Sequence, residues 1–225
     1  AQTMVDIGKL AGKPVVAVIT SMAQPLGTHI GNALEVKDAI DVLAGRTQGD
    51  LLEISLLLGS HMLVLAEKAK TLPEARAMLE NALSSGAGLR KLAEMIAAQG
   101  GDSRVVEDLS LLPQAAVKRV MRAETAGYLS AMDTTALGMA AQRMGAGRAK
   151  KSDMLDYSVG YVLHVRLGDE VTEDTPLATL YARNEAEAEE AEKAIRKALT
   201  IARKKPQTPK LWDAVVTAEG ITYNR

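Results

Sequence analysis

The feature that most constrains the fold of this chain is a change of hydrophobic pattern at Leu112 and Pro113. Before this point apolar residues recur mainly at helical spacing. After it they alternate with polar residues in short segments separated by turns. The two spacings place apolar side chains on one face of a helix or of a strand, respectively. The pattern therefore predicts two parts, an α/β piece made mostly of helices and then a compact α+β module.

The first part is expected to contain one buried parallel strand among helices. The run "PVVAVIT" (14–20) is continuous, apolar and rich in β-branched residues. A helix ending at Gly12 is expected before it. Four helices are expected after it, at 31–44, 50–69, 72–84 and 88–99. The helix at 50–69 is apolar nearly all round, which predicts a central position in its domain.

The second part is expected to begin with strands on either side of a turn at Gly127, followed by a helix that Asp133 caps. Three short strands are predicted within 156–182. Asn184 and Glu187 form a capping pair, which predicts a helix from Asn184 to Lys205. The last stretch, "LWDAVVTAEGITY", is expected to be extended.

These patterns give the expected fold class, an α/β fragment with a buried parallel strand, followed by an α+β hammerhead-like, barrel-sandwich-related module. The expected boundaries are 1–112 for the α/β part, 113–127 for a linker and first strand, 128–202 for the module and 203–225 for an extended tail.

The barrel-sandwich expectation comes from "LGDEVTEDTPLATL", which resembles the hairpin of biotinyl and lipoyl carrier domains. Those carriers present a modifiable lysine in the turn just after this hairpin. Here the following residues are "YARNEAEA", which contain no lysine, so carrier chemistry is not supported. A non-catalytic binding or scaffold module of this kind is the alternative function.

Composition excludes several functions. The chain has 225 residues, of which 47% are hydrophobic and 24% charged, enough for a folded core. Its net charge of -1 argues against nucleic-acid binding. The absence of cysteine excludes disulfides, thiolate metal sites and a cysteine nucleophile, and fits a reducing cytoplasm. No apolar run is long enough to cross a membrane, and an opening at Ala1 with a helix already in progress suggests a start within a longer domain.

Few side chains present themselves as catalytic or metal-binding groups. The three histidines, His29, His61 and His164, are scattered, and no His/Asp/Glu cluster has zinc spacing. His61 and His164 lie in apolar segments, which favours core or interface positions. "MGAGR" (144–148) could hold a phosphate, but a glycine helix end followed by a turn is the favoured interpretation. The acid-rich stretch 185–192 is interpreted as a solvated helix face.

The motifs taken in order resemble one enzyme family. "KPVVAVITSMAQPLGTHIGNALEVKDAIDVLAG", "LGSHMLVLAEKA", "MDTTALGMAAQRMGAGR" and "DYSVGYVLHVRLGD" are similar to segments of pyrimidine-nucleoside and thymidine phosphorylases. Within that family "QPLG" and "LEVKDAI" resemble the broad-specificity bacterial pyrimidine-nucleoside type. The resemblance implies a cytoplasmic, homodimeric pentosyltransferase. Such an enzyme uses phosphate to cleave pyrimidine nucleosides into free base and pentose 1-phosphate.

The resemblance also implies that this chain corresponds to the C-terminal half of such enzymes. In the family the residues that bind the pyrimidine, and a glycine-rich phosphate loop, lie in the other half. The one Gly-Gly here, Gly100–Gly101, lacks the surroundings of that loop. No catalytic or substrate-binding residue therefore carries over. The chain alone is expected to be inactive, and it may be monomeric on this interpretation.

The resemblance implies one partial metal site. In the bacterial type a potassium ion lies near the phosphate loop, and its ligands from this half map to the backbone carbonyls of Leu26 and His29 and the carboxylate of Asp38. A hard cation takes oxygen ligands, and a loop broken by proline and glycine can turn its carbonyls inward. The family more often has glutamate at Asp38 and a small residue at His29. The alternative is that this loop only shapes a turn and that Asp38 is solvated.

Overall fold

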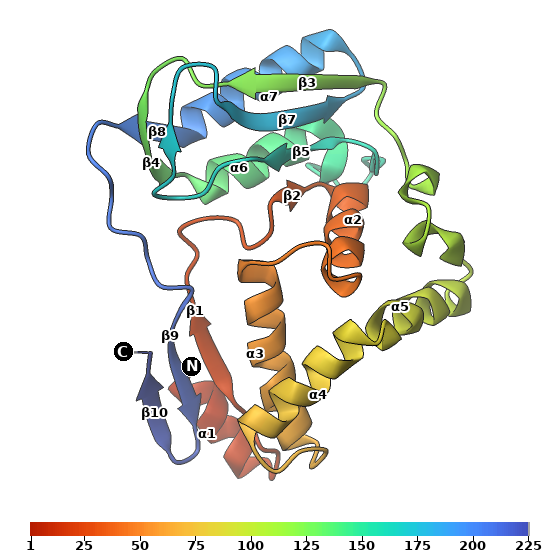
Figure 1. The fold of residues 1–225 in the computed structure, drawn as a ribbon, viewed down its shortest axis with the longest axis vertical. Helices are drawn as coiled ribbons and strands as arrows, with labels where there is room; N and C mark the ends of the chain where they lie inside the picture. The colour runs from red at the N-terminus through yellow and green to blue at the C-terminus, as the bar shows by residue number, and fades with distance from the viewer. Residues whose placement is uncertain (225) are drawn as a thin grey trace. The chain divides into compact units, whose positions relative to one another are not determined.

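The computed structural model describes residues 1–224, and contacts divide the chain into two compact units (Figure 1). The first unit contains residues 1–21, 42–91 and 209–225, and the second contains 22–41 and 92–208. The segment 22–41 thus packs with the C-terminal module, although the chain on both sides of it belongs to the other unit. None of the helices described is long and apolar enough to cross a membrane.

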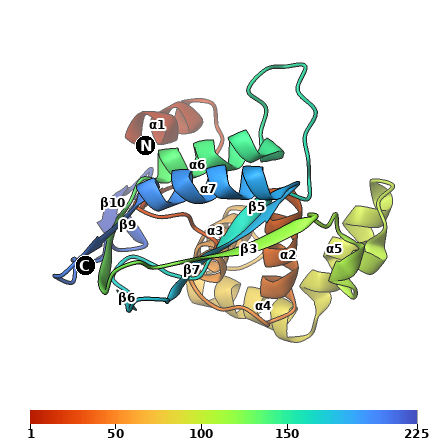
Figure 2. The same cartoon turned by 90° about the horizontal axis from the view of Figure 1, so that it is seen from above.

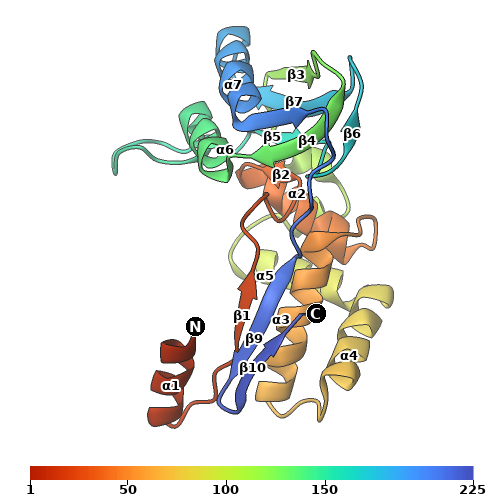
Figure 3. The ribbon, with the colours of Figure 1, turned by 90° about the vertical axis from the view of Figure 1, so that its left-hand side faces the viewer.

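The first unit combines a small sheet with packed helices. Its sheet has three strands in the order β1 (Ala17–Thr20), β9 (Trp212–Thr217) and β10 (Gly220–Tyr223). Figure 3 shows these strands side by side. The helices are α1 (Gln2–Leu10), α3 (Asp50–Leu65), α4 (Leu72–Ser84) and the first part of α5 (Ala87–Ala98). Thr71 caps α4 as predicted, since its side chain accepts a hydrogen bond from the Glu74 amide.

The prediction of a parallel strand at 14–20 is wrong. β1 pairs antiparallel with β9, with Ala17 opposite Val216. Every strand pair in residues 1–224 is antiparallel. An apolar β-branched run favours an extended backbone, but it does not encode the direction of its partner. The partner comes from the far end of the chain, in the segment that was expected to be a plain extended tail.

The helix at 50–69 is shorter and less central than predicted. α3 packs on α4 through Leu52 and Leu56, against Leu79 and Leu83. Its other side is open in this unit, and Met62 is 68% exposed. Continuous hydrophobicity therefore does not translate here into burial on all sides.

The second unit begins with the segment 22–41. It contains β2 (His29–Ile30) and most of α2 (Asn32–Leu43), and the later residues include the end of α5 and two short 3-10 helices, η1 (Ser103–Val106) and η2 (Leu109–Leu111). Two antiparallel sheets follow. One has the order β2, β5 (Gly160–Leu163), β7 (Pro176–Ala182), β3 (Val117–Arg122), and the other has β6 (Glu170–Val171), β4 (Gly127–Met132), β8 (Leu199–Ala202).

Helices α6 (Thr134–Ala141) and α7 (Glu185–Ala198) lie against the four-stranded sheet (Figure 2). The hydroxyl of the buried Tyr161, on β5, donates to the carbonyl of Leu137 on α6 at 2.8 Å. Arg119 on β3 donates to Glu192 on α7 at 2.8 Å. The core between them contains Met121, Leu129, Leu163, Leu180 and Ile195. This core includes a π-helical end of α6, η3 (Gln142–Ala146), which carries Met144.

The helix predicted from Asn184 to Lys205 ends early. Asn184 caps it as expected, with its side chain accepting from the Glu187 amide at 2.9 Å. The helix stops at Ala198, and residues 199–202 form β8, in which Ile201 lies opposite Leu129 of β4. β-branched Thr200 and Ile201 fit a strand better than a helix, and β4 supplies the partner. The basic residues 203–205 therefore lie beyond the helix rather than in its last turn.

Candidate functional site

The loop that precedes α2 is held by the second unit. The Leu163 amide donates a hydrogen bond to the Thr28 carbonyl at 2.8 Å. The Gln24 side-chain oxygen accepts from the Leu167 amide at 3.0 Å. The Met22 carbonyl accepts from the Thr134 hydroxyl at 3.2 Å. These bonds join the loop to residues more than a hundred positions later, so they fix which way its carbonyls point.

The carbonyl of His29 faces away from the sheet's interior. His29 lies opposite Val162, and the hydrogen bond runs from the next residue, Leu163, to the previous one, Thr28. In an antiparallel ladder this pattern marks a non-hydrogen-bonded pair, whose peptide groups point outward. Since β2 is the edge strand, the His29 carbonyl is directed to the open edge.

Asp38 is buried rather than solvated. It is 4% exposed, and its Oδ1 lies 3.4 Å from Nδ1 of His29. The other ring nitrogen of His29, Nε2, is 3.4 Å from the Lys37 ammonium. Lysine can only donate, so Nε2 accepts and the ring proton belongs on Nδ1, which lies 3.0 Å from the Thr28 hydroxyl oxygen and 3.4 Å from Asp38 Oδ1. The alternative of a solvated helix residue is therefore wrong for Asp38.

The electrostatics of His29 agree with this tautomer. Burial lowers the pKa of His29 below its ordinary value, and the carboxylate of Asp38 opposes that shift. The Lys37 charge lowers the His29 pKa further. The ring is therefore neutral near pH 7.

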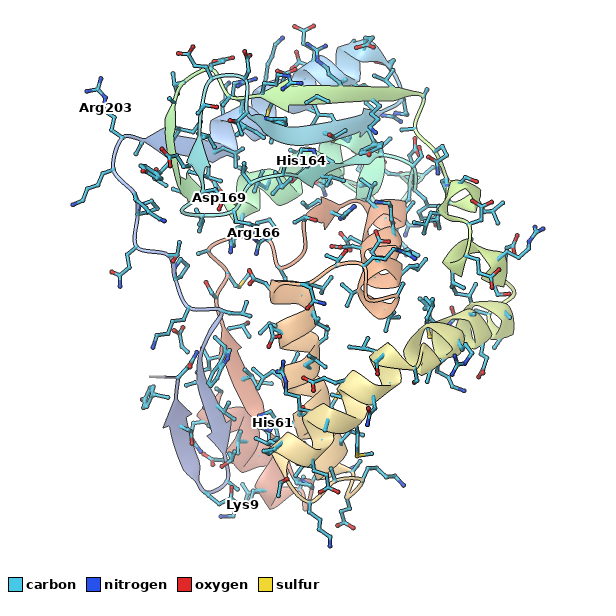
Figure 4. All side chains as sticks on the ribbon, in the orientation of Figure 1. Lys9, His61, His164, Arg166, Asp169 and Arg203 are labelled. Atoms are coloured by element: carbon cyan, nitrogen blue, oxygen red, sulfur yellow. The ribbon has the colours of Figure 1, made fainter. Side chains whose placement is uncertain are left out.

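The carbonyl of Leu26 has a partner that sequence reasoning missed. The guanidinium of Arg166 donates from Nη1 to the Pro25 carbonyl at 2.7 Å and from Nη2 to the Leu26 carbonyl at 3.4 Å. Figure 4 labels Arg166 beside this loop, with Asp169 close by in the turn that follows β5. No local signal could have found this contact, because 141 positions separate Arg166 from Pro25.

Of the predicted ligand residues, Asp38 lies beside the His29 ring, and the Leu26 carbonyl is in contact with Arg166. The Asp38 carboxylate is buried beside the His29 ring, and the His29 carbonyl is directed outward. The Leu26 carbonyl already accepts from a positive group, although its second lone pair leaves room for another partner. Oxygen atoms are the ligands that hard cations take. Within residues 1–224 no cluster of three histidine, aspartate or glutamate side chains suits a metal ion.

The other two histidines lie outside this loop. His61 is half-buried in α3, its Nε2 has no hydrogen-bond partner among residues 1–224, and burial lowers its pKa. His164 was expected at a core or interface position; its side chain is exposed in the second unit, and its Nε2 is 2.7 Å from the Thr179 hydroxyl. Its pKa is lowered by partial burial and by the Lys118 charge. These three histidines do not converge on one site.

The glycine-rich stretches are helix ends. Gly145, with a φ of 107°, lies in the last turn of η3, and Gly147 follows that turn. After β7 the chain enters α7 directly, and the first lysine there, Lys193, forms an ion pair with Glu189 at 2.8 Å. A lysine in a turn after the hairpin is thus absent from this part of the chain, which leaves the carrier interpretation without support.

Comparison with known proteins finds two family matches and several similar relatives. Residues 1–89 match the model of the glycosyl transferase family a/b domain, and 128–202 match that of the pyrimidine nucleoside phosphorylase C-terminal domain. The chain is 50% identical over 185 residues to a pyrimidine-nucleoside phosphorylase of Bacillus subtilis, which is 82% of this chain and 43% of that protein. A Staphylococcus aureus pyrimidine-nucleoside phosphorylase is 43% identical over 202 residues, 90% of this chain and 46% of that protein.

The chain therefore spans less than half the length of these relatives. The two domain matches cover separate segments, first 1–89 and then 128–202. The 185 residues aligned with the Bacillus subtilis protein extend into both segments. On these grounds the chain belongs to the pyrimidine nucleoside phosphorylase family.

Proposed function

We propose that this chain acts as part of a pyrimidine-nucleoside phosphorylase, which uses phosphate to cleave pyrimidine nucleosides into free base and pentose 1-phosphate. The observation that carries the proposal is 50% identity over 82% of the chain to a protein of that name. Phosphate and a pyrimidine nucleoside are the proposed substrates, and a cytoplasmic homodimer is the proposed assembly. Since the chain spans 43% of that relative, we propose that the binding residues for base and phosphate come from the remainder.

The proposed contribution of this chain is to position groups beside the reacting ones. The loop 22–31 belongs to the a/b domain match by sequence, yet it packs with the unit that contains the C-terminal domain match. Holding phosphate, sugar and base in register accounts for a large part of catalysis in bimolecular reactions.

A chimaera tests the proposed function. In the Bacillus subtilis relative, the segment that aligns with this chain would be removed, and this chain would be joined to the rest of that protein in its place. The chimaera is expected to release uracil from uridine in the presence of phosphate, and to release none without phosphate. A chimaera that folds and binds uridine but forms no pentose 1-phosphate would contradict the proposal.

We also propose that Asp38, the His29 carbonyl and the Leu26 carbonyl form half of a potassium site in the longer enzyme. Bound potassium would supply positive charge and hold the loop. In the chimaera, Asp38→Asn keeps the shape of the side chain and removes its charge. The potassium concentration that gives half-maximal phosphorolysis is expected to rise at least about tenfold.

Titration of activity with potassium chloride, at an ionic strength held constant with choline chloride, measures this effect. The matched control is Asp41→Asn, one helical turn further along α2, where the side chain lies at 3.6 Å from Lys37. In Asp41→Asn, the potassium concentration that gives half-maximal phosphorolysis should stay at the value of the parent chimaera. Identical curves for the parent chimaera and Asp38→Asn would remove Asp38 from the site.

A further inference from the structure

Arg166 brings a permanent positive charge to the loop carbonyls. Its amide donates to the Asp169 carboxylate at 2.7 Å, which fixes the start of the turn after β5. From there its side chain reaches back to two successive carbonyls, with Nη1 at 2.7 Å from Pro25 O and Nη2 at 3.4 Å from Leu26 O. A guanidinium is planar, always charged and offers donors in a fixed fork, so it holds both carbonyls in one orientation.

This contact changes what the loop offers to a soluble cation. Two neighbouring carbonyls turned toward one positive group are the arrangement that a hard cation uses. Here the positive group is part of the protein. A cation bound at Leu26 would share that oxygen with Nη2 of Arg166 and would be repelled by its charge.

We propose that Arg166 is a built-in cation of the loop and sets the potassium affinity of the half-site by competing for the Leu26 carbonyl. This inference rests on the proposed half-site of Asp38, His29 and Leu26. Arg166 then has two effects of opposite sign. It orders the loop, which helps binding, and it occupies one ligand and repels the ion, which weakens binding. The weak Nη2 contact, at 3.4 Å, is the one that an incoming cation would replace.

The experiment uses the chain itself and needs no enzymatic activity. Potassium that binds the folded chain but not the unfolded one raises the free energy of unfolding by RT ln(1 + c/Kd), where c is the potassium concentration, so a fit of that rise against c gives the half-saturating concentration, Kd. Potassium chloride is titrated against choline chloride at constant ionic strength. Arg166→Met is expected to lower the half-saturating potassium concentration about tenfold, since it removes both the competing donor and the charge. It should also lower the Tm in choline chloride, because the loop loses two hydrogen bonds.

Two further variants separate charge from geometry. Arg166→Lys keeps the charge and loses the fork. It should lower the Tm in choline chloride while its half-saturating potassium concentration stays near that of the parent chain. Arg122→Met is the matched control, because Nη1 of Arg122 donates to the Asp174 carbonyl at 2.7 Å, far from the loop in sequence. It should cost stability without moving the potassium curve.

The outcomes separate the role of Arg166 from the potassium half-site on which it depends. If Asp38→Asn abolishes the potassium effect but Arg166→Met leaves the half-saturating concentration unchanged, the half-site stands and the role of Arg166 is overturned. If potassium stabilises no variant of this chain but Asp38→Asn still shifts the potassium curve of the chimaera, the role of Arg166 is overturned and the half-site stands; if neither responds, both are overturned. A potassium effect seen in Arg166→Met and absent from the parent chain supports the proposal. Should Arg166→Met fail to fold, Arg166→Gln, which keeps one amide donor, is measured in the same way.

Discussion

Gly160→Ala is expected to lower the free energy of unfolding by roughly 4 kcal/mol, among the largest effects of a single substitution in this chain. Gly160 has a φ of 147°, and a Cβ built on it would lie 2.1 Å from the Ile30 carbonyl oxygen and 2.9 Å from Cα of Gly31. Both obstacles are backbone atoms, so no rotamer change can relieve the overlap. Strand β2 would have to separate from β5.

Gly160→Ala should destabilise strands β2 and β5 more than the other strands of the second unit. Gly31 is the other half of the contact, since its own Cβ would lie 2.5 Å from the Val159 carbonyl. Separation of the two strands would release the loop that precedes α2 together with the His29 carbonyl. Hydrogen exchange of the β2 and β5 amides should therefore accelerate more than that of β4 and β8.

Thermal or urea unfolding followed by circular dichroism measures the change. Gly138→Ala is the control, because Gly138 lies inside α6 and a Cβ there has no neighbour within 4 Å. That substitution should raise stability by about 0.5 to 1 kcal/mol through helix propensity. A Gly160→Ala chain as stable as Gly138→Ala would show that the two strands can move apart without cost.

The local elements of this fold could be predicted because their signals are local. Thr71, Asp133 and Asn184 each cap the helix that follows, as their spacing indicates. Strands also form on either side of the predicted turn near Gly127, although β3 and β4 belong to different sheets. Each of these signals acts within four residues of the position it determines. The local amino-acid sequence is therefore sufficient to predict these elements.

Features that depend on distant partners could not be predicted in the same way. The direction of β1 is set by β9, nearly two hundred positions later, and the early end of α7 is set by the availability of β4. The loop before α2 was predicted as a site from its resemblance to a family. Its contact with Arg166, by contrast, arises only when the turn after β5 is brought beside it. The alternation of a strand fixes its two faces, and tertiary structure decides its neighbours.

The 225-residue chain by itself is expected to catalyse no phosphorolysis of uridine or thymidine. Its two glycine-rich candidates for phosphate binding are both used to end helices. Gly100 has a φ of 81°, and the amides of Gly100 and Gly101 donate to Ala97 and Ile96 at the end of α5. Arg148, after the second stretch, donates to the Asp153 carbonyl at 3.1 Å. Neither segment presents a row of amides for a phosphate.

Turnover by the chain alone should fall at least about 10⁴-fold below that of the chimaera, because positioning of the reactants is the term that half a site cannot supply. Both proteins would be purified identically from a host that lacks its own pyrimidine phosphorylases, and uracil release would be followed with saturating phosphate. Residual turnover has two possible sources, and Arg166→Met separates them. Uracil release by a contaminant does not change with that substitution, whereas uracil release by the chain itself should change. Phosphorolysis that elutes with the chain and changes with Arg166→Met would mean that these residues contain a complete site.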